Sequence, residues 1–271
     1  MKEIRLRKPA GLDQLETRNM ELRRVTRGEI RVRLHASSLN VHDSFVLKGV
    51  IPTEAGRIPL SDGAGEVIEI GADVTEFSPG DKVVSTFFSS WLAGKPTAQR
   101  LAAIAGESID GYARDEVVAP ATAFTRAPAG YSDIEAATLP CAALTAWRAL
   151  FVEGLIQPGE TVLIQGTGGV STFALLFAKA AGARIIATSS SDTKLERLRS
   201  MGAHELINYK RTPTGVRRHG NWPAGAASIT SSRSVALALW PNPSRPVPSA
   251  ERLRRSVCSP DSQESCPSAR C

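Results

Sequence analysis

The sequence contains no apolar run that approaches the roughly 20 residues needed for a membrane-spanning helix. Residues 1–7 also lack the apolar stretch of a secretion signal. With 271 residues, of which 42% are hydrophobic, the chain is long enough to build two domains with their own cores. We therefore expect a globular, cytoplasmic protein without a membrane partner.

Cysteine is scarce, with four residues in the chain. Cys258, Cys266 and Cys271 match no usual metal-ligand spacing, and no secretion signal accompanies them, so we interpret them as incidental thiols. Cys141 stands alone in the body of the chain. We interpret it as a small buried residue, with a metal ligand or a nucleophile as the alternatives.

Net charge is almost absent from the first 211 residues. The formal net charge is +6, but residues 212–271 hold eight arginines, no lysine and three acids, so five of the six net positive charges lie there. These arginines form no helical basic face and are not interleaved with aromatic residues. This pattern argues against nucleic acid as a partner. DNA binding that weakens steeply with salt would instead support a nucleic-acid-binding function.

The same terminal segment lacks any hydrophobic period of 2 or 3.6 residues. It holds eight of the 17 prolines and eleven serines. Before it, strand-like and helix-like segments alternate with turn residues between them. We place a boundary near Pro213 and expect an irregular, low-complexity tail at 213–271.

The first part of the chain, residues 1–127, is predicted to be a β-rich domain. Residues 29–35 alternate between polar and apolar side chains, residues 64–70 form a short apolar strand, and residues 82–85 follow a Pro-Gly-Asp turn. Several short strands of this kind need to close on one core.

The hydrophobic period changes after Ser132. Residues 133–152 suit a helix, and Ser132 with Glu135 has the spacing of a capping box. A β-branched run at 161–165 is typical of a buried parallel strand, and it leads directly into a glycine-rich turn and an apolar helix at 172–181. Glycine lets the backbone approach a pyrophosphate at the positive end of a helix. The candidate cofactor-binding residues of this turn are Gly166, Thr167, Gly168, Gly169 and Val170.

A second strand at 183–188, a helix at 192–201 closed by Gly202, and a third strand at 205–209 follow. This order of elements predicts half of a Rossmann fold at 128–212. NAD sites carry an acid at the end of the second strand, whereas this chain has a serine run there and Lys194 one turn later. Hydroxyls and an ammonium group suit the 2′-phosphate of NADP(H), through Ser189, Ser190 and Lys194. An ordinary helix N-terminus with a solvated lysine is the alternative.

Several motifs together resemble the medium-chain dehydrogenase/reductase superfamily, in particular its zinc-free quinone oxidoreductase and alcohol dehydrogenase-like branch. They are Asp-Gly-Ala-Gly-Glu-Val at 62–67, Gly-Asp-Lys-Val-Val at 80–84, Gly-Tyr-Ala at 111–113, Ala-Ala-Thr-Leu-Pro at 136–140, and the glycine turn. The resemblance covers residues 1 to about 212. It implies an α/β protein with a GroES-like catalytic domain and a truncated, doubly wound Rossmann domain, in a family that is usually homodimeric.

The resemblance also bears on the chemistry. Zinc members of the superfamily hold their catalytic metal at three places, which match Asn40, Ser61 and Cys141 here, so we expect no metal. Family likeness implies that Asn40 lies near the nicotinamide, followed in the same loop by Asp43. We interpret both as candidate catalytic residues, Asn40 as a donor or orienting group, with a turn-capping role as the alternative.

Further expectations follow from the resemblance. Tyr209 belongs to an Asn-Tyr run that lies near the adenosine phosphate in family members. His35 and His42 are interpreted as surface or satisfied histidines and not as catalytic bases. The predicted function is an NADPH-dependent reductase of a small carbonyl, quinone or activated alkene, impaired in this chain. The alternative is a dinucleotide-binding protein without hydride transfer.

A shifted reading frame would explain the tail from about Thr214. The tail is rich in Arg, Ser and Pro, as expected when a GC-rich gene is read out of register. Reading one base earlier across residues 226–242, allowed codons spell Gly-Val-Asp-His-Val-Val-Glu-Val-Gly-Gly-Pro-Gly-Thr-Leu-Ala-Gln, which resembles the fourth strand and glycine turn of the family. A genuine disordered extension is the alternative. Resequencing the gene tests this hypothesis, and an intact frame with NADPH turnover by the 271-residue chain would contradict it.

Overall fold

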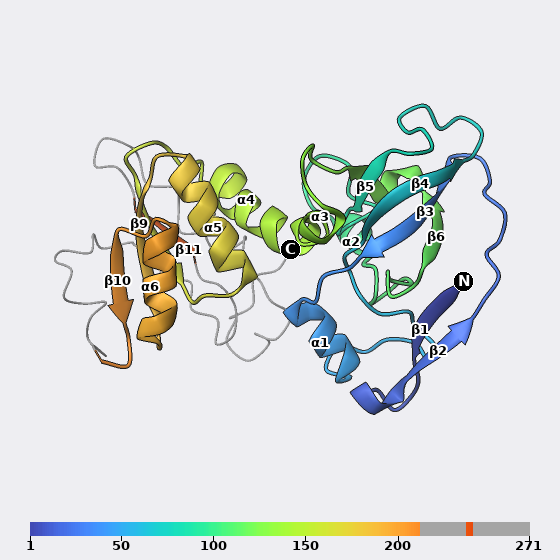
Figure 1. Ribbon diagram of the computed structural model, residues 1–271, viewed down its shortest axis with the longest axis horizontal. Helices are drawn as coiled ribbons and strands as arrows, with labels where there is room; N and C mark the ends of the chain where they lie inside the picture. The colour runs from blue at the N-terminus through green and yellow to red at the C-terminus, as the bar shows by residue number, and fades with distance from the viewer. Residues whose placement is uncertain (212–236, 241–271) are drawn as a thin grey trace. The chain divides into compact units, whose positions relative to one another are not determined.

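The structure is a computed structural model that describes residues 1–211 and the short strand 237–240 (Figure 1). The chain divides into two compact units, Met1–Cys141 and Ala142–Cys271. The predicted tail at 213–271 and its proposed shift of reading frame lie outside the described residues, apart from strand 237–240.

The first unit is built on an antiparallel sheet, as the alternating patterns predict. Its strand order is β6-β3-β4-β5-β7. The three strands expected from the sequence at 29–35, 64–70 and 82–85 are all confirmed within one residue. The bounds are β3 (Glu29–Ala36), β4 (Ala64–Ile70), β5 (Lys82–Ser85), β6 (Glu116–Pro120) and β7 (Phe124–Arg126).

One face of this sheet carries the core of the unit. Ile30 and Val32 of β3 and Val67 of β4 are fully buried and pack together. Burial of each such side chain contributes about 1.5–3 kcal/mol to stability. The strands β3 and β4 approach so closely that a Cβ on Gly65 would lie 1.9 Å from the carbonyl oxygen of Arg33. Only glycine fits at this position of the Asp-Gly-Ala-Gly-Glu-Val motif.

Smaller elements complete the first unit. A two-stranded antiparallel ribbon lies beside the helix α1, whose Val46 and Leu47 pack with Leu6. The elements are β1 (Lys2–Leu6), η1 (Leu12–Gln14), β2 (Leu15–Asn19), α1 (Val41–Leu47), α2 (Ala98–Leu101) and η2 (Ala121–Ala123).

The helical segment expected at 133–152 is present but is not one continuous α-helix. The predicted capping box is confirmed, because Ser132 N–H donates to Glu135 Oε2 at 2.9 Å and Glu135 N–H donates to Ser132 Oγ at 3.3 Å. Pro140 has no N–H and crowds the preceding turn, so the regular α pattern does not continue through it. The segment consists of α3 (Asp133–Ala136), the π-helical η3 (Leu139–Ala143), α4 (Leu144–Trp147) and the π-helical η4 (Arg148–Glu153).

The start of this helical segment belongs to the first unit. Ala136 and Ala137 are buried against Ala64 and Val84 of the sheet. The first compact unit therefore extends to Cys141, beyond the sequence-based boundary at residue 127.

The second unit contains the predicted strand-helix repeat. Parallel strands β8, β9 and β10 are joined by α5 and α6, and their order in the sheet is β10-β9-β8. These are the first three strands of a Rossmann fold, in the order that the fold requires. The bounds are β8 (Thr161–Gln165), α5 (Gly169–Ala180), β9 (Arg184–Ser189), α6 (Asp192–Met201) and β10 (Glu205–Asn208).

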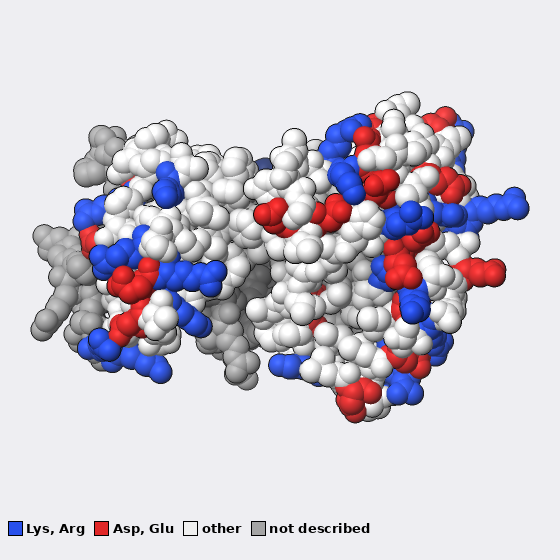
Figure 2. All heavy atoms as spheres, in the orientation of Figure 1, with Lys and Arg blue, Asp and Glu red and all other residues white. Residues whose placement is uncertain are grey.

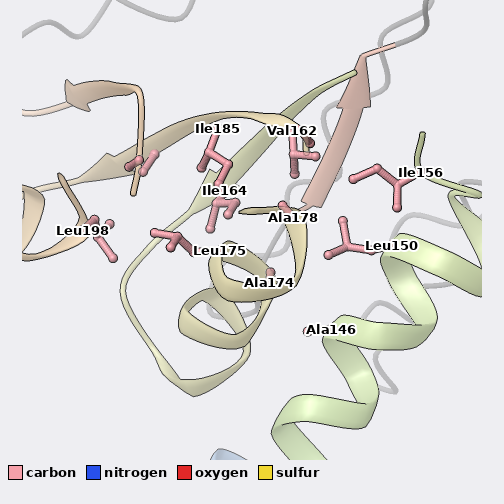
Figure 3. Packing of buried hydrophobic residues seen from close by; sticks show 13 residues of the cluster. Ala146, Leu150, Ile156, Val162, Ile164, Ala174, Leu175, Ala178, Ile185 and Leu198 are labelled. Atoms are coloured by element: carbon pink, nitrogen blue, oxygen red, sulfur yellow. The ribbon is translucent and has the colours of Figure 1, made fainter. Parts of the chain in front are cut away.

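Figure 3 shows how the core of this unit forms. Ala174, Leu175 and Ala178 of α5 face Val162 and Ile164 of β8, and all five are fully buried. The alanines are small, which lets the helix lie close to the sheet. This packing fixes the N-terminus of α5 at the carboxyl end of β8.

A fourth strand, β11 (Leu237–Trp240), pairs with β8 in the antiparallel direction. An irregular tail was expected after residue 212, and this strand corrects that expectation. The short apolar run pairs with the otherwise open edge of β8 and satisfies its backbone groups. In a doubly wound Rossmann sheet, the strand at this position runs parallel to its neighbour.

Candidate functional site

The glycine turn between β8 and α5 has the geometry of a phosphate-binding loop. Gly166 adopts φ +85°, a conformation that favours glycine, and its N–H donates to Thr188 O of β9 at 3.0 Å. Ser171 Oγ donates to Gln165 O at 3.0 Å and closes the turn from the helix side. The turn is therefore tied to both neighbouring strands.

The other two glycines have different roles. A Cβ built on Gly168 would meet no heavy atom within 4 Å, so space for a ligand lies beside this residue. A Cβ on Gly169 would lie 3.4 Å from the Cβ of Ala142, so the start of α5 lies against Ala142. Thr172 N–H makes the first helical bond, to Gly168 O at 2.9 Å.

These features fit a dinucleotide. The first N–H groups of a helix have no helical acceptors, and the helix dipole favours an anion there. The predicted residues Thr167 and Val170 lie in the same turn and are half-buried. The open side of Gly168 is the place where a pyrophosphate would meet these N–H groups.

The end of β9 lies beside the glycine turn in the parallel sheet. Ser189 is only 4% exposed, and its Oγ accepts a hydrogen bond from Ser191 N–H at 3.3 Å. Ser191 is the N-cap of α6 and accepts from Lys194 N–H at 3.5 Å. Two serines were predicted to face a phosphate. Ser189 is buried and bound to the backbone of Ser191, whereas Ser190 is half-buried.

Lys194 and Tyr209 are both exposed in the same unit. Tyr209 N–H donates to Ser189 O at 3.2 Å, and Asn208 pairs with Ser189 in the sheet. Tyr209 and the serine run therefore lie at neighbouring strand ends, and the proximity of Tyr209 to the adenosine phosphate stays a prediction.

Two charged residues of this strand end were missed by the sequence analysis. Asp192 Oδ1 accepts from Asn208 Nδ2 at 2.6 Å, and its Oδ2 forms an ion pair with Arg211 at 2.5 Å. Arg211, the second of two basic residues after the Asn-Tyr run, was the available signal. Its partner is 19 positions away in the sequence, and only the packing of β10 beside β9 brings them together.

A second polar cluster lies in the first unit, around the fully buried carboxylate of Asp62. Ser38 Oγ donates to Asp62 Oδ2 at 2.6 Å, and Asn40 Nδ2 donates to the same oxygen at 2.8 Å. Ser61 Oγ donates to Oδ1 at 3.4 Å. Burial raises the pKa of Asp62, although hydrogen bonds from Ser38 and Asn40 oppose the rise.

Asn40 and Asp43, the two predicted catalytic residues, are neighbours in this cluster. Asp43 Oδ2 accepts from Asn40 N–H at 2.8 Å, and its Oδ1 accepts from Ser61 N–H at 2.9 Å. Asn40 is the N-cap position of α1. Its side-chain N–H groups also lie within reach of Ser38 Oγ at 3.1 Å, so the local acceptors occupy them.

Cys141 borders the same cluster and is half-buried. Its backbone N–H donates to Asp62. Burial, together with the carboxylates of Asp62 and Asp43, raises the pKa of the Cys141 thiol to about 12. A thiol of this kind stays protonated at neutral pH, which agrees with the interpretation of Cys141 as an inert buried residue.

The donor set of this cluster does not fit a catalytic zinc. Asn40 and Ser61 present hydrogen-bond donors to Asp62, which leaves Cys141 as the single zinc-type ligand among these three residues. Within residues 1–211, no three His, Cys, Asp or Glu side chains are grouped so that they could hold a metal ion.

The two histidines considered in the sequence analysis are both paired with carboxylates. His35 Nδ1 lies 2.7 Å from Asp133 Oδ2, and His42 Nε2 lies 2.7 Å from Glu107 Oε2. Burial lowers the pKa of His42, but the carboxylates of Asp43 and Glu107 outweigh this effect, and the net shift is upward. His35 is paired as predicted, whereas His42 is paired only through Nε2, because its buried Nδ1 makes no hydrogen bond and lies 3.8 Å from Asp43 Oδ1.

Comparison with known proteins agrees with these observations. The family model for the alcohol dehydrogenase GroES-like domain matches residues 26–129, and the model for zinc-binding dehydrogenases matches residues 169–231. The second match passes beyond the boundary placed near Pro213. None of the helices in the described ranges, 1–211 with strand 237–240, is long and apolar enough to cross a membrane.

Individual relatives cover most of this chain but less of their own length. A zinc-type alcohol dehydrogenase-like protein of Schizosaccharomyces pombe is 44% identical over 227 residues, which is 82% of this chain and 64% of the relative. The crystal structure of an NAD-dependent alcohol dehydrogenase is 33% identical, with a TM-score of 0.72 over 80% of this chain and 67% of that one.

A quinone oxidoreductase of Pseudomonas syringae pv. tomato DC3000 is 28% identical, with a TM-score of 0.66 over 80% of this chain and 61% of that one. The chain thus spans about two thirds of the length of these proteins. The GroES-like unit, the Rossmann strands with their glycine turn, and these matches together show that the chain belongs to the medium-chain dehydrogenase/reductase superfamily.

Proposed function

We propose that this chain binds NADP(H) in its second unit and takes part in hydride transfer to a small carbonyl, quinone or activated alkene. The observation that carries the proposal is the glycine turn at the N-terminus of α5, next to a β9 end that has serines where NAD sites have an acid. Relatives named as NAD-dependent alcohol dehydrogenase and as quinone oxidoreductase support the reaction class.

The preference for NADP(H) rests on the residues around the β9 end. Ser190, the exposed Lys194 and the exposed Tyr209 supply two hydroxyls and one ammonium group. The cofactor, when bound, supplies the hydride chemistry. Ser190 and Lys194 would hold the 2′-phosphate, and the N–H groups of the α5 N-terminus would hold the pyrophosphate.

The first unit would act without a metal, because its donor set does not fit zinc. Both side-chain N–H groups of Asn40 face acceptors in the Asp62 cluster, so we assign Asn40 an orienting role instead of a direct donor role. Asp43 fixes the start of α1 through the backbone of Asn40 and Ser61. Together they keep the predicted catalytic loop in one conformation.

A second candidate function is dinucleotide binding without hydride transfer. Strand β11 runs antiparallel to β8, at the position where a doubly wound sheet has a parallel strand that begins its second half. This arrangement, together with the engaged amide of Asn40, favours a chain that holds the adenosine half of the cofactor but turns over poorly.

Two measurements separate these functions. Fluorescence titration with NADPH and NADH measures cofactor binding, and NADPH oxidation across a panel of quinones, enones and aldehydes measures turnover. Binding with turnover supports the reductase, and binding without turnover supports the second candidate. Failure to bind either dinucleotide would contradict both.

The chain is also proposed to work in the cytoplasm as a homodimer, as its family usually does, on a small-molecule substrate. Light scattering after size-exclusion chromatography measures the assembly, and fractionation of cells measures the location. A monomer that retains full turnover would contradict the dimer.

A further inference from the structure

The carboxylate of Asp192 is occupied on both oxygens. Oδ1 accepts from Asn208 Nδ2 at 2.6 Å, and Oδ2 pairs with Arg211 at 2.5 Å. Figure 2 shows side chains of both charges gathered over α6, the helix that begins with Asp192. The side chains of Asp192 and Arg211 are 46% and 75% exposed, so the pair is open to solvent and to a ligand.

This ion pair lies at the strand end where the cofactor's adenosine ribose is recognised in Rossmann folds. Asp192 follows the N-cap Ser191 directly, and Asn208 pairs with Ser189 in the sheet. Tyr209 N–H also donates to Ser189 O. The Asp192–Arg211 ion pair therefore lies next to the serine run.

The chemistry of Asp192 conflicts with a 2′-phosphate unless its charge is balanced. A free carboxylate at this strand end accepts a hydrogen bond from a ribose 2′-hydroxyl and repels a phosphate. Arg211 supplies a positive charge directly on the carboxylate, and Asn208 occupies the other oxygen. The negative charge of Asp192 is thus balanced by Arg211, which follows β10 and is far from the serine run in sequence.

We propose that Arg211 sets the preference for a 2′-phosphate by neutralising Asp192. The inference rests on the proposed NADP(H) binding. Without Arg211, the carboxylate of Asp192 is left with Asn208 alone and repels a 2′-phosphate while tolerating a 2′-hydroxyl. Arg211 is a specificity-determining residue in this scheme, and Asp192 is the group through which it acts.

Calorimetric titration of the full chain with 2′,5′-ADP and with 5′-AMP tests the scheme. The two probes share adenosine and a 5′-phosphate and differ in the 2′ group, so their affinity ratio isolates the 2′ preference and needs no turnover. The variants are Arg211→Ala, Asp192→Asn and the double variant. Arg199→Ala is the matched control, because Arg199 is an exposed arginine of α6 in an ion pair with Glu196 at the other end of the helix.

The original chain should prefer 2′,5′-ADP. We expect Arg211→Ala to lose about tenfold in affinity for 2′,5′-ADP, the scale of one charge-assisted contact, with 5′-AMP unchanged. The double variant should regain most of that loss, because the amide that replaces the Asp192 carboxylate carries no charge. Arg199→Ala should match the original chain.

Other outcomes overturn the inference in distinguishable ways. If the double variant binds 2′,5′-ADP as weakly as Arg211→Ala, Arg211 contacts the phosphate directly and does not act through Asp192. An unchanged Arg211→Ala also overturns it, and in both cases NADP(H) binding stands. If the original chain binds neither probe, the proposed function fails, and this inference fails with it.

Discussion

Asn40 Nδ2 lies 2.8 Å from Asp62 Oδ2, so the amide predicted to assist catalysis is directed at a fully buried carboxylate. The same carboxylate accepts from Ser38 Oγ at 2.6 Å. The loop that carries Asn40 is therefore held by a side chain 22 positions further along the chain. Ser38 and Asn40 of the candidate catalytic loop therefore share one acceptor, Asp62 Oδ2.

Asp62→Asn should lower the free energy of unfolding by about 1–3 kcal/mol, because an amide NH2 replaces one of the two buried oxygens that accept from Ser38, Asn40 and Ser61. Urea unfolding followed by circular dichroism measures the change. Glu54→Gln is the matched control, since the Glu54 side chain is 86% exposed and its substitution should change stability by less than about 0.5 kcal/mol. An Asp62→Asn variant as stable as the control would show that the cluster contributes little.

Asn40→Ala should reduce turnover while leaving the affinity for NADPH within about twofold, because Asn40 lies in the first unit and the glycine turn in the second. Asn40→Ser separates capping from orientation, since serine is also a good N-cap residue but has no amide. Steady-state kinetics and NADPH titration provide the two readouts. If Asn40→Ser keeps full turnover, the role of Asn40 is to cap α1 and nothing more.

Stoichiometric zinc should be absent from the purified protein, because Asn40 and Ser61 stand at two of the three places where zinc relatives have ligands. Elemental analysis after dialysis against a chelator measures the metal content. About one zinc per chain after this treatment would contradict the assignment. Added zinc should also leave the unfolding midpoint unchanged, because no binding free energy is gained by the folded state.

Lys194→Ala should weaken NADPH binding by about tenfold, the effect of one lost charge-assisted phosphate contact, and leave NADH binding unchanged. Lys179→Ala on α5 is a control for loss of a surface charge, since Lys179 Nζ donates to Met201 O, at the C-terminal end of α6. Fluorescence titration of both dinucleotides measures the ratio. Equal affinity of the original chain for NADPH and NADH would refute the assignment.

Cys141 should react slowly with thiol reagents at neutral pH, because its pKa is raised to about 12 from an ordinary value of about 8.5. A variant with Cys258, Cys266 and Cys271 replaced by serine isolates its rate. The folded-state pKa is the higher one, so the stabilising contribution is present below about pH 8.5 and decreases as pH rises toward 12. A labelling rate equal to that of the urea-unfolded chain would contradict the shifted pKa.

Local patterns predicted the parts of the fold that depend on neighbours in sequence. The capping box at Ser132 and Glu135 and the turn at Gly166 need only a few adjacent residues, and both form as expected. The apolar pattern at 133–152 did not show the interruption, which only Pro140 itself signals, because proline has no N–H for the helix.

Contacts between distant residues explain what the sequence analysis could not predict. Ser189 has the right residue type for a phosphate, but its burial depends on pairing with β10. The donors of Asn40 and the partner of Asp192 are likewise set by tertiary packing, which a single sequence does not display. Residue types alone therefore indicated the chemistry of the site but not which atoms are available for it.

Hydrogen-bond donors converge on Asp62, whereas a metal centre is surrounded by electron-pair donors. A divalent cation draws lone pairs inward and attracts negative charge that develops on a substrate oxygen. Here hydroxyl, amide and backbone N–H groups surround a carboxylate, and the field of the buried ion has the opposite sign. Negative charge close to this carboxylate would be repelled, whereas a metal ion would attract the same charge.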